Sequence, residues 1–246
     1  MTKLSVNINK IALIRNSRKG NNPSLKFFSR KIIEAGADGI TVHPRPDQRH
    51  IRADDLSDLA EVAHQLNVEF NIEGNPYEES DGDYPGFLNL IESVKPSQCT
   101  LVPDDTNQLT SDHGWNIHSE QDKLKAVLEY LRTNNIRSSI FLDPDKSQLD
   151  AAKDIGVDRV EIYTGPFAEA FKKEDEKTLA TYESAIQYAN EISLELNAGH
   201  DLNLENIATL LSYGDIKEVS IGHALISESL IYGIENTIQK YTKIIQ

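Results

Sequence analysis

Several features that often define a structural class are scarce or missing in this chain of 246 residues. There is a single cysteine, Cys99, which excludes an internal disulfide. Its apolar neighbours Leu101 and Val102 indicate a buried strand position, so we expect a structural rather than a catalytic thiol. The sequence contains no apolar run long enough to cross a bilayer and no apolar signal segment after Met1. We therefore expect a cytoplasmic protein with no membrane partner.

Positive charge is also in short supply. Lysine and arginine total 25 against 39 aspartates and glutamates, which gives a formal net charge of -14. So acidic a chain is poorly suited to binding duplex nucleic acid or an anionic membrane, and we expect neither as a partner. A small phosphorylated substrate remains compatible with this charge if its binding site is locally positive.

The sequence does contain many short apolar runs, rich in Val, Ile and Leu, that alternate with segments of helical periodicity. This alternation is typical of βα units and a parallel sheet. The number of strands and the lack of a linker favour one domain, 1–246, folded as a closed (β/α)8 TIM barrel rather than an open doubly wound sheet. The glycine signature of a dinucleotide-binding fold is missing after the first strand. The eight predicted strands are 4–8, 39–43, 68–73, 98–102, 138–142, 159–162, 194–197 and 218–221.

Three connections are longer than a minimal barrel requires. Segment 75–86 is rich in Asp, Glu, Gly and Pro, and we interpret it as a solvated loop. Segment 103–118 is polar and without strong periodicity, which makes it a candidate lid. Segment 9–22 also lacks regular periodicity, yet it concentrates lysine and arginine in an otherwise acidic protein.

Polar side chains occur where the predicted strands end. His43, Glu73 and Glu161 belong to the second, third and sixth strands, and His200 follows the seventh. Each of them alone is more often structural than catalytic, but in a barrel the carboxyl ends of all strands meet at one rim, where the active site lies. Two imidazoles and two carboxyl groups in one cavity form an acid/base set suited to repeated proton transfers.

The same residue types are common ligands of divalent metals, which is the weaker alternative. No helical HExxH motif or paired aspartates accompany them, and Arg45 close to His43 would oppose a cation. We therefore expect no metal.

Two segments are candidate anion sites. Gly222 and His223 lie at the predicted start of the last helix, where backbone N–H groups and the helix dipole attract phosphate, with Asp201 nearby. Segment 43–50 offers Arg45 and His50 as phosphate ligands, although a solvated charged loop is the alternative interpretation. Two anion sites beside an acid/base centre indicate substrates with two phosphorylated ends.

Seven runs of residues resemble those of the pyridoxine 5'-phosphate synthase family. They are distributed from the first predicted strand to the last, so the resemblance covers the chain. The runs are 6–9 (VNIN), 15–18 (RNSR), 36–43 (GADGITVH), 49–51 (RHI), 101–103 (LVP), 197–200 (NAGH) and 221–224 (IGHA).

This resemblance implies a barrel with a few extra helices and a reaction that needs no cofactor. That reaction is the condensation of 3-amino-2-oxopropyl phosphate with 1-deoxy-D-xylulose 5-phosphate to pyridoxine 5'-phosphate, phosphate and water. By matching motif, His43 and Glu73 would be proton acceptors, His200 a proton donor, and Glu161 a carboxylate that stabilises charge in the transition state.

The resemblance also implies the binding residues and the assembly. Family members form homo-octamers in which a neighbouring subunit completes the site, and Arg18 is the candidate for that contact. The aminoketone phosphate would contact Asn7, Arg18, Asp201, Gly222 and His223. The deoxyxylulose phosphate would contact Asn9, Lys10, Arg45, His50 and Thr110.

Three departures from the family's common pattern involve four positions. Asn9 and Lys10 replace an Asp-His pair, Asp201 replaces a glycine, and Tyr163 replaces a histidine. Lys10 can hold a phosphate or hydroxyl but cannot shuttle protons near neutral pH without a large pKa shift. The carboxylate of Asp201 would weaken phosphate binding unless it points away from the ligand.

Two rival interpretations remain. Another phosphosugar barrel enzyme, such as an isomerase, an epimerase or an aldolase, fits the fold, but a Schiff-base aldolase needs a desolvated lysine and only Lys10 comes near a strand end. A non-catalytic phosphometabolite sensor would need the anion sites alone, whereas this chain keeps all four acid/base groups.

Overall fold

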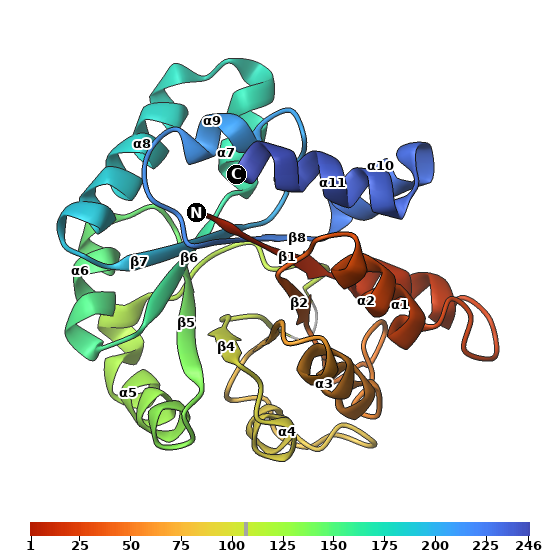
Figure 1. The fold of residues 1–246 in the computed structure, drawn as a ribbon. Coiled ribbons are helices and arrows are strands. Elements are labelled where there is room, and N and C mark those ends of the chain that lie inside the picture. Colours follow the sequence, from red (N-terminus) through yellow and green to blue (C-terminus); the bar gives the residue numbers. More distant parts are fainter. Residues whose placement is uncertain (106–107) are drawn as a thin grey trace.

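The computed structural model describes residues 1–105 and 108–246, and these residues form a closed barrel of eight parallel strands (Figure 1). Each strand pairs with the next, and β8 pairs with β1, which rules out the open doubly wound sheet and confirms the predicted (β/α)8 barrel. The strands are β1 (Lys3–Asn7), β2 (Gly39–Val42), β3 (Glu69–Gly74), β4 (Gln98–Leu101), β5 (Arg137–Leu142), β6 (Arg159–Tyr163), β7 (Glu195–Gly199) and β8 (Glu218–Ile221).

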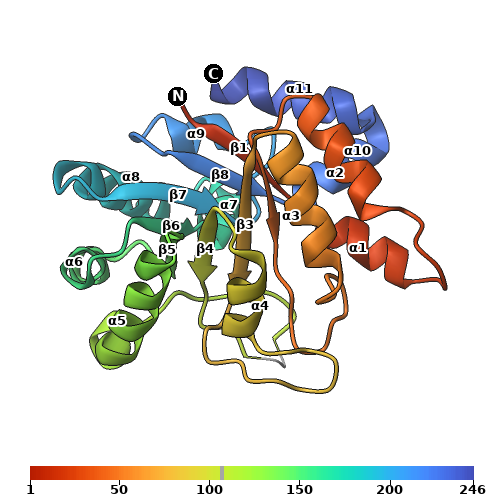
Figure 2. The ribbon, with the colours of Figure 1, turned by 60° about the horizontal axis from the view of Figure 1, so that its bottom comes forward.

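Helices form the outer layer around these strands, and the long connections after β2, β3 and β4 extend from the end of the barrel opposite the two termini (Figure 2). Within the described ranges, every helix is too short or too polar to span a membrane. The helices are α1 (Asn9–Asn16), α2 (Leu25–Glu34), α3 (Asp55–Gln65), α4 (Phe87–Val94), α5 (Ile117–Thr133), α6 (Lys146–Ile155), α7 (Gly165–Lys173), α8 (Glu176–Glu191), α9 (Ile207–Leu211), α10 (His223–Tyr232) and α11 (Ile234–Ile245).

The sequence encodes several helix boundaries directly. Ser24 begins α2 by accepting a hydrogen bond from the Phe27 N–H at 3.3 Å. Asp145 begins α6 in the same way, with the Ser147 N–H at 2.8 Å, and Gly156 ends that helix in the left-handed conformation at φ +78°. These local signals fix where the chain leaves one strand and returns to the next.

The prediction that segment 9–22 is irregular is wrong for its first half, which forms α1. The N-cap residue of this helix is Ile8, whose apolar side chain cannot cap it, so the sequence carries no usual start signal at that position, although Asn7 Oδ1 accepts the Asn9 N–H at 3.0 Å. Its buried face consists of Ile11, Ala12 and Arg15. The Arg15 guanidinium forms an ion pair with Asp55 and donates to the His50 carbonyl at 3.1 Å, so this basic residue ties α1 to the chain after β2.

Segment 75–86 is a loop with many exposed polar residues, as predicted, but it is not purely solvated. Tyr84 is fully buried in the hydrophobic core, which anchors the loop, and its hydroxyl donates to Glu78 of the same loop at 3.4 Å. Cys99 is buried in β4, as the sequence predicted, and burial raises the pKa of its thiol. The candidate lid, 103–118, includes positions 106–107, which lie outside the described residues.

The interior of the barrel is polar, whereas branched apolar residues dominate most barrels of this kind. The hydroxyls of Ser5 and Thr41 lie 2.7 Å apart, and Thr100 donates to Asn71 at 3.1 Å. All four side chains are buried and come from consecutive strands. The apolar core therefore lies between the strands and the helices, and the inner row of side chains is held by hydrogen bonds.

A buried carboxyl group, Glu218, lies at the amino-terminal end of this interior. Gln98 donates to it at 3.3 Å, and Gln98 in turn accepts from Arg137 at 2.8 Å. Burial raises the pKa of Glu218 to about 7, with Glu69 acting in the same direction and Arg137 opposing. Because the folded-state pKa lies above the usual value, the stability contributed by protonated Glu218 is lost as pH rises from about 4.5 to 7.

We expect Glu218→Gln to remove this pH dependence. A pKa shift of this size corresponds to about 3 kcal/mol. Between pH 5 and 8, the free energy of unfolding should therefore fall by up to about 3 kcal/mol less in the variant than in the unmodified protein. Urea unfolding at several pH values measures the difference. The exposed Glu205→Gln serves as the control, and an unchanged pH slope in Glu218→Gln would contradict the assignment.

Candidate active site

A cavity of about 410 Å³ lies at the carboxyl ends of the strands. All four predicted acid/base residues, His43, Glu73, Glu161 and His200, line it. Nearly all of the predicted binding residues line it as well, namely Asn7, Asn9, Lys10, Arg45, His50, Thr110, Asp201, Gly222 and His223. The structure thus brings together groups that lie far apart in the sequence.

Arg18 is the exception among the predicted binding residues. It follows α1, is exposed, and donates to the Ser17 carbonyl at 3.0 Å. It does not line the cavity of its own chain.

Several residues at or beside the cavity were absent from the predicted set, among them Arg49, Ser111 and Asp104. Arg49 lines the cavity and donates to the carbonyls of Gln108 and Leu109 at 2.9 and 2.7 Å. Ser111 also lines it, and Asp104 is buried beside it. Asp104 follows β4, so the rule that selected the other strand-end residues would have found it.

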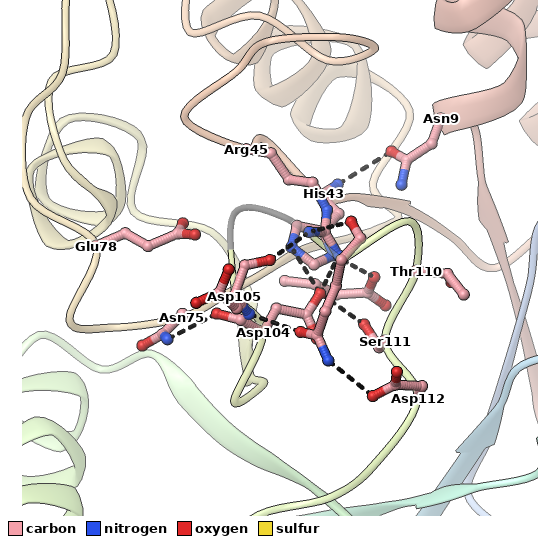
Figure 3. Close-up of polar contacts among 12 residues, drawn as sticks. Asn9, His43, Arg45, Asn75, Glu78, Asp104, Asp105, Thr110, Ser111 and Asp112 are labelled. Carbon is pink, nitrogen blue, oxygen red and sulfur yellow. Dashed lines mark hydrogen bonds and ion pairs between the residues drawn. The ribbon is translucent and has the colours of Figure 1, made fainter.

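His43 lies between two carboxyl groups. Its Nδ1 is 3.8 Å from Glu73 Oε2, and its Nε2 is 3.8 Å from Asp104 Oδ2. The His43 backbone N–H donates to Asn9 Oδ1 at 3.0 Å, as Figure 3 shows, which fixes the backbone at the end of β2. Burial, together with the charge of Arg45, holds the pKa of His43 well below its usual range. The imidazole is therefore neutral and can accept a proton.

Glu73 and Glu161 have pKa values shifted upward. Burial raises the pKa of Glu73 well above its usual value, and the charges of Glu161 and Asp104 add to this effect. Burial also raises the pKa of Glu161 to about 8, with Glu218 contributing. Both groups therefore favour the protonated form near neutral pH. Protonated Glu73 beside neutral His43 forms a pair that holds a proton ready for transfer.

His200 is held in an unusual backbone conformation, with φ at +91°. The Thr164 hydroxyl donates to the His200 carbonyl at 2.6 Å, and the Tyr163 ring lies edge-on to the imidazole at 5.1 Å between centroids. The Nε2 atom of His200 lies 3.4 Å from the Thr110 hydroxyl. Burial lowers the pKa of His200, whereas Asp201 acts in the opposite direction.

Gly199, which precedes His200, allows a close approach that a side chain would block. A Cβ at this position would lie 2.6 Å from Glu161 Oε1 and 3.0 Å from the Ser220 carbonyl oxygen. Glycine therefore leaves room for the Glu161 carboxyl group to reach the cavity.

Cationic and neutral donors gather on one side of the cavity. Burial lowers the pKa of His50 to about 3, and Arg49 and Arg45 act in the same direction, so His50 is neutral. Its Nδ1 accepts the Ile51 N–H at 2.9 Å, which leaves Nε2 as a donor. Lys10 lines the cavity and has no hydrogen-bond or ion-pair partner among the residues that the structure describes.

Another part of the cavity lining is formed by the start of α10. Gly222 caps this helix and His223 is its first residue. The free N–H groups and the dipole at a helix N-terminus attract an anion. In residues 1–105 and 108–246, no three His, Cys, Asp or Glu side chains are arranged to hold a metal ion.

The closed barrel and this cavity, whose lining combines acid/base groups with cationic side chains and a helix N-terminus, define an enzyme of the (β/α)8-barrel class. The family described as "Pyridoxal phosphate biosynthesis protein PdxJ" matches residues 4–246. The chain belongs to this family.

Relatives with high identity carry one name, "Pyridoxine 5'-phosphate synthase". The protein from Christiangramia forsetii is 48% identical over 100% of both chains. The protein from Xanthomonas campestris pv. campestris is 47% identical over 99% of this chain and 96% of its own length. The protein from Cytophaga hutchinsonii is 46% identical over 99% of this chain and 98% of its own.

Similarity to solved structures extends to more distant barrels. A tryptophan synthase from M. tuberculosis aligns with a TM-score of 0.66 at 11% identity, over 99% of this chain and 92% of that one. Thiamine phosphate pyrophosphorylase from Pyrococcus furiosus aligns with a TM-score of 0.61 at 12% identity, over 99% and 95%. At these identities the similarity concerns the fold alone.

We expect Lys10→Met to weaken the binding of inorganic phosphate to the cavity by about tenfold or more, because a charge-assisted hydrogen bond contributes about 1.5–3 kcal/mol. Isothermal titration calorimetry measures the dissociation constant. Lys19→Met is the matched control, since Lys19 is exposed and lies outside the cavity lining. Equal phosphate affinity in the Lys10 and Lys19 variants would remove Lys10 from the anion site.

Proposed function

We propose that this cavity is the site at which the chain acts as a pyridoxine 5'-phosphate synthase. It would condense 3-amino-2-oxopropyl phosphate with 1-deoxy-D-xylulose 5-phosphate to pyridoxine 5'-phosphate, phosphate and water. The observation that supports this placement is the meeting of His43, Glu73, Glu161 and His200 in one cavity with an anion-attracting side at either end.

The reaction needs proton transfer at nearly every stage. The amine of one substrate adds to the ketone of the other and water is lost, which gives an imine. Phosphate then leaves, and a carbon–carbon bond closes the ring, which becomes aromatic. Several acid/base groups are needed because each stage moves at least one proton. Enclosure of the imine would also protect it from water.

The proposed acid/base role of each group follows from its protonation state. Neutral His43 accepts a proton from the substrate, and the adjacent Glu73 becomes an acceptor once it has given up its own proton, since a proton on either residue can pass to the other. His200 donates a proton, and a bound phosphate favours its charged form because negative charge nearby raises the pKa of an imidazole. Glu161 stabilises cationic character on the imine nitrogen, and that positive charge in turn favours its ionised form.

The two phosphates would occupy opposite sides of the cavity. The aminoketone phosphate binds at the start of α10, with contacts from Asn7, Asp201, Gly222 and His223 and from Arg18 of a neighbouring subunit. The deoxyxylulose phosphate binds on the cationic side, with contacts from Asn9, Lys10, Arg45, His50 and Thr110.

The assembly belongs to the same proposal. A single-domain barrel, 1–246, forms a homo-octamer in the cytoplasm, in which Arg18 reaches the cavity of a neighbour. The exposure of Arg18 outside its own cavity supports this, as do Leu230 and Ile231, which are 81% and 76% exposed. Analytical ultracentrifugation gives the number of subunits. In a second experiment, Arg18→Ala chains are mixed with chains that are inactive at His200, and this mixture would recover activity only if Arg18 acts between subunits.

Incubation of the purified chain with the two substrates tests the function. The expected result is the appearance of pyridoxine 5'-phosphate, followed by absorbance, together with released inorganic phosphate. Isomerisation or cleavage of 1-deoxy-D-xylulose 5-phosphate without ring formation would instead indicate a different phosphosugar enzyme. Binding of both phosphates without turnover would indicate a sensor.

We expect His200→Ala and Glu73→Gln each to lower turnover by about a hundredfold or more, because each removes a group that transfers protons in the transition state. Steady-state measurement of pyridoxine 5'-phosphate formation gives the ratio. The exposed residues His64 and Glu205 supply the matched controls, His64→Ala and Glu205→Gln. Near-normal turnover in both site variants would reject the assigned roles.

A further inference from the structure

Asp104 is a buried carboxylate beside the cavity that none of the proposed roles uses. It follows β4, and only 2% of its surface is exposed. Figure 3 shows it among the side chains that surround His43 and Arg45. Its Oδ2 forms an ion pair with Arg45 and accepts the Ser111 hydroxyl at 2.9 Å.

Two buried polar atoms in this cluster have no hydrogen-bond partner among the described residues. They are Nε2 of His43 and Oδ1 of Asp104. The same two side chains approach to 3.8 Å between His43 Nε2 and Asp104 Oδ2. Buried polar atoms are rarely left unpaired, and exceptions concentrate at functional sites. A small movement of the Asp104 carboxylate would satisfy both atoms at once.

The contacts of Arg45 oppose that movement. It forms the ion pair with Asp104 and also donates to the carbonyls of Asp105 and Gln108 at 3.4 and 3.3 Å. In the proposed function Arg45 is a ligand of the deoxyxylulose phosphate. A phosphate and Asp104 therefore compete for one guanidinium, and a bidentate phosphate is the stronger ligand for its paired donors.

We propose that Asp104 is a positioning residue for His43. While the phosphate site is empty, Asp104 neutralises Arg45. When a substrate phosphate takes Arg45, the Asp104 carboxylate accepts a hydrogen bond from Nε2–H of His43 and leaves Nδ1 as the proton acceptor. This inference rests on the proposed function, because it takes Arg45 as the phosphate ligand and His43 as the base.

The resulting arrangement has a carboxyl group at each imidazole nitrogen. In the proton-transfer step, a substrate proton moves to Nδ1 of His43, and the imidazolium that forms is stabilised by Asp104 at Nε2. Glu73, whose carboxyl group lies 3.8 Å from Nδ1 and is protonated near neutral pH, takes up this proton only after it has given its own proton to the substrate in another step. No other reactant is required, and the catalytic base would be fully oriented only with substrate bound.

The charges around His43 are consistent with this arrangement. Arg45, His50 and Arg49 lower the basicity of the imidazole, while Glu73 and Asp104 lie at its two nitrogens. A bound phosphate would cancel the charge of Arg45 and free the charge of Asp104. Both changes make His43 a better proton acceptor. Phosphate binding would thus be coupled to the strength of the base.

Asp104→Asn tests the proposal, because an amide neither neutralises Arg45 nor stabilises an imidazolium. We expect the variant to bind inorganic phosphate about tenfold more tightly by calorimetry, a size typical of coupling between two sites. We expect its turnover to fall about a hundredfold, with no rise in KM for 1-deoxy-D-xylulose 5-phosphate, because the loss concerns the proton-transfer step. A general structural defect would raise KM and weaken phosphate binding instead.

Two further variants complete the experiment. Asp104→Glu keeps the charge and should recover turnover to within about tenfold of the unmodified enzyme. Asp112→Asn removes a charge from the same connection but is exposed and bonded to Gln108 and His113, so it should change neither measurement. If Asp104→Asn does not fold, Ser111→Ala tests the proposal in its place, because it removes one hydrogen bond to Asp104. We then expect phosphate affinity to rise and turnover to fall, each by about threefold.

Unchanged or weaker phosphate binding in Asp104→Asn would overturn the proposal, and so would turnover within about twofold of normal. These outcomes differ from a failure of the proposed function, in which the unmodified chain itself forms no pyridoxine 5'-phosphate. Even then, the phosphate titration would show whether Asp104 and a phosphate compete for Arg45.

Discussion

Closure of the sheet between β1 and β8 is the constraint on which the site depends. The register pairs Val6 with Ile221, so Asn7 at the end of β1 lies beside Gly222 at the start of α10. A parallel barrel directs all its strand ends to one rim, and residues from the first to the eighth strand therefore share one cavity. An open sheet would spread the same side chains along an edge.

Burial then sets the chemistry of the groups that the barrel brings together. Removal from water holds His43 and His50 neutral and favours the protonated forms of Glu73 and Glu161. A neutral base beside a protonated acid can exchange a proton with it, whereas carboxyl groups in water are ionised near neutral pH and have no proton to give. The polar interior below the rim also affects the site, because Glu218 contributes to the raised pKa of Glu161.

The sequence predicted the parts of this structure that depend on periodicity and on strand ends. The eight strands appeared within a few residues of their bounds, because alternating apolar runs are local signals, and the rim rule collected the four acid/base residues. Sequence reasoning could not predict α1, whose N-cap residue makes no side-chain hydrogen bond to the helix. Nor could it predict the burial of Tyr84, which depends on how the 75–86 loop packs. The pairing of Arg45 with Asp104 was equally out of reach, because it joins two connections whose conformations no local pattern specifies. The position of Asp104 after β4 was the one available signal.

The departures from the family's common pattern can be understood through His200. Lys10, where the pattern has an imidazole, lowers the pKa of His200, and Asp201, where the pattern has glycine, raises it. Each substitution alone would change the tendency of His200 to donate a proton, but their charges have opposite sign and both residues line the cavity. The Lys10 side chain also supplies a cation that has no competing partner among the described residues, on the side where Arg45 is held by Asp104. In the proposed function, an approaching phosphate would therefore contact Lys10 first and displace Asp104 from Arg45 second, so a departure that removes a proton shuttle would also give the anion its first contact.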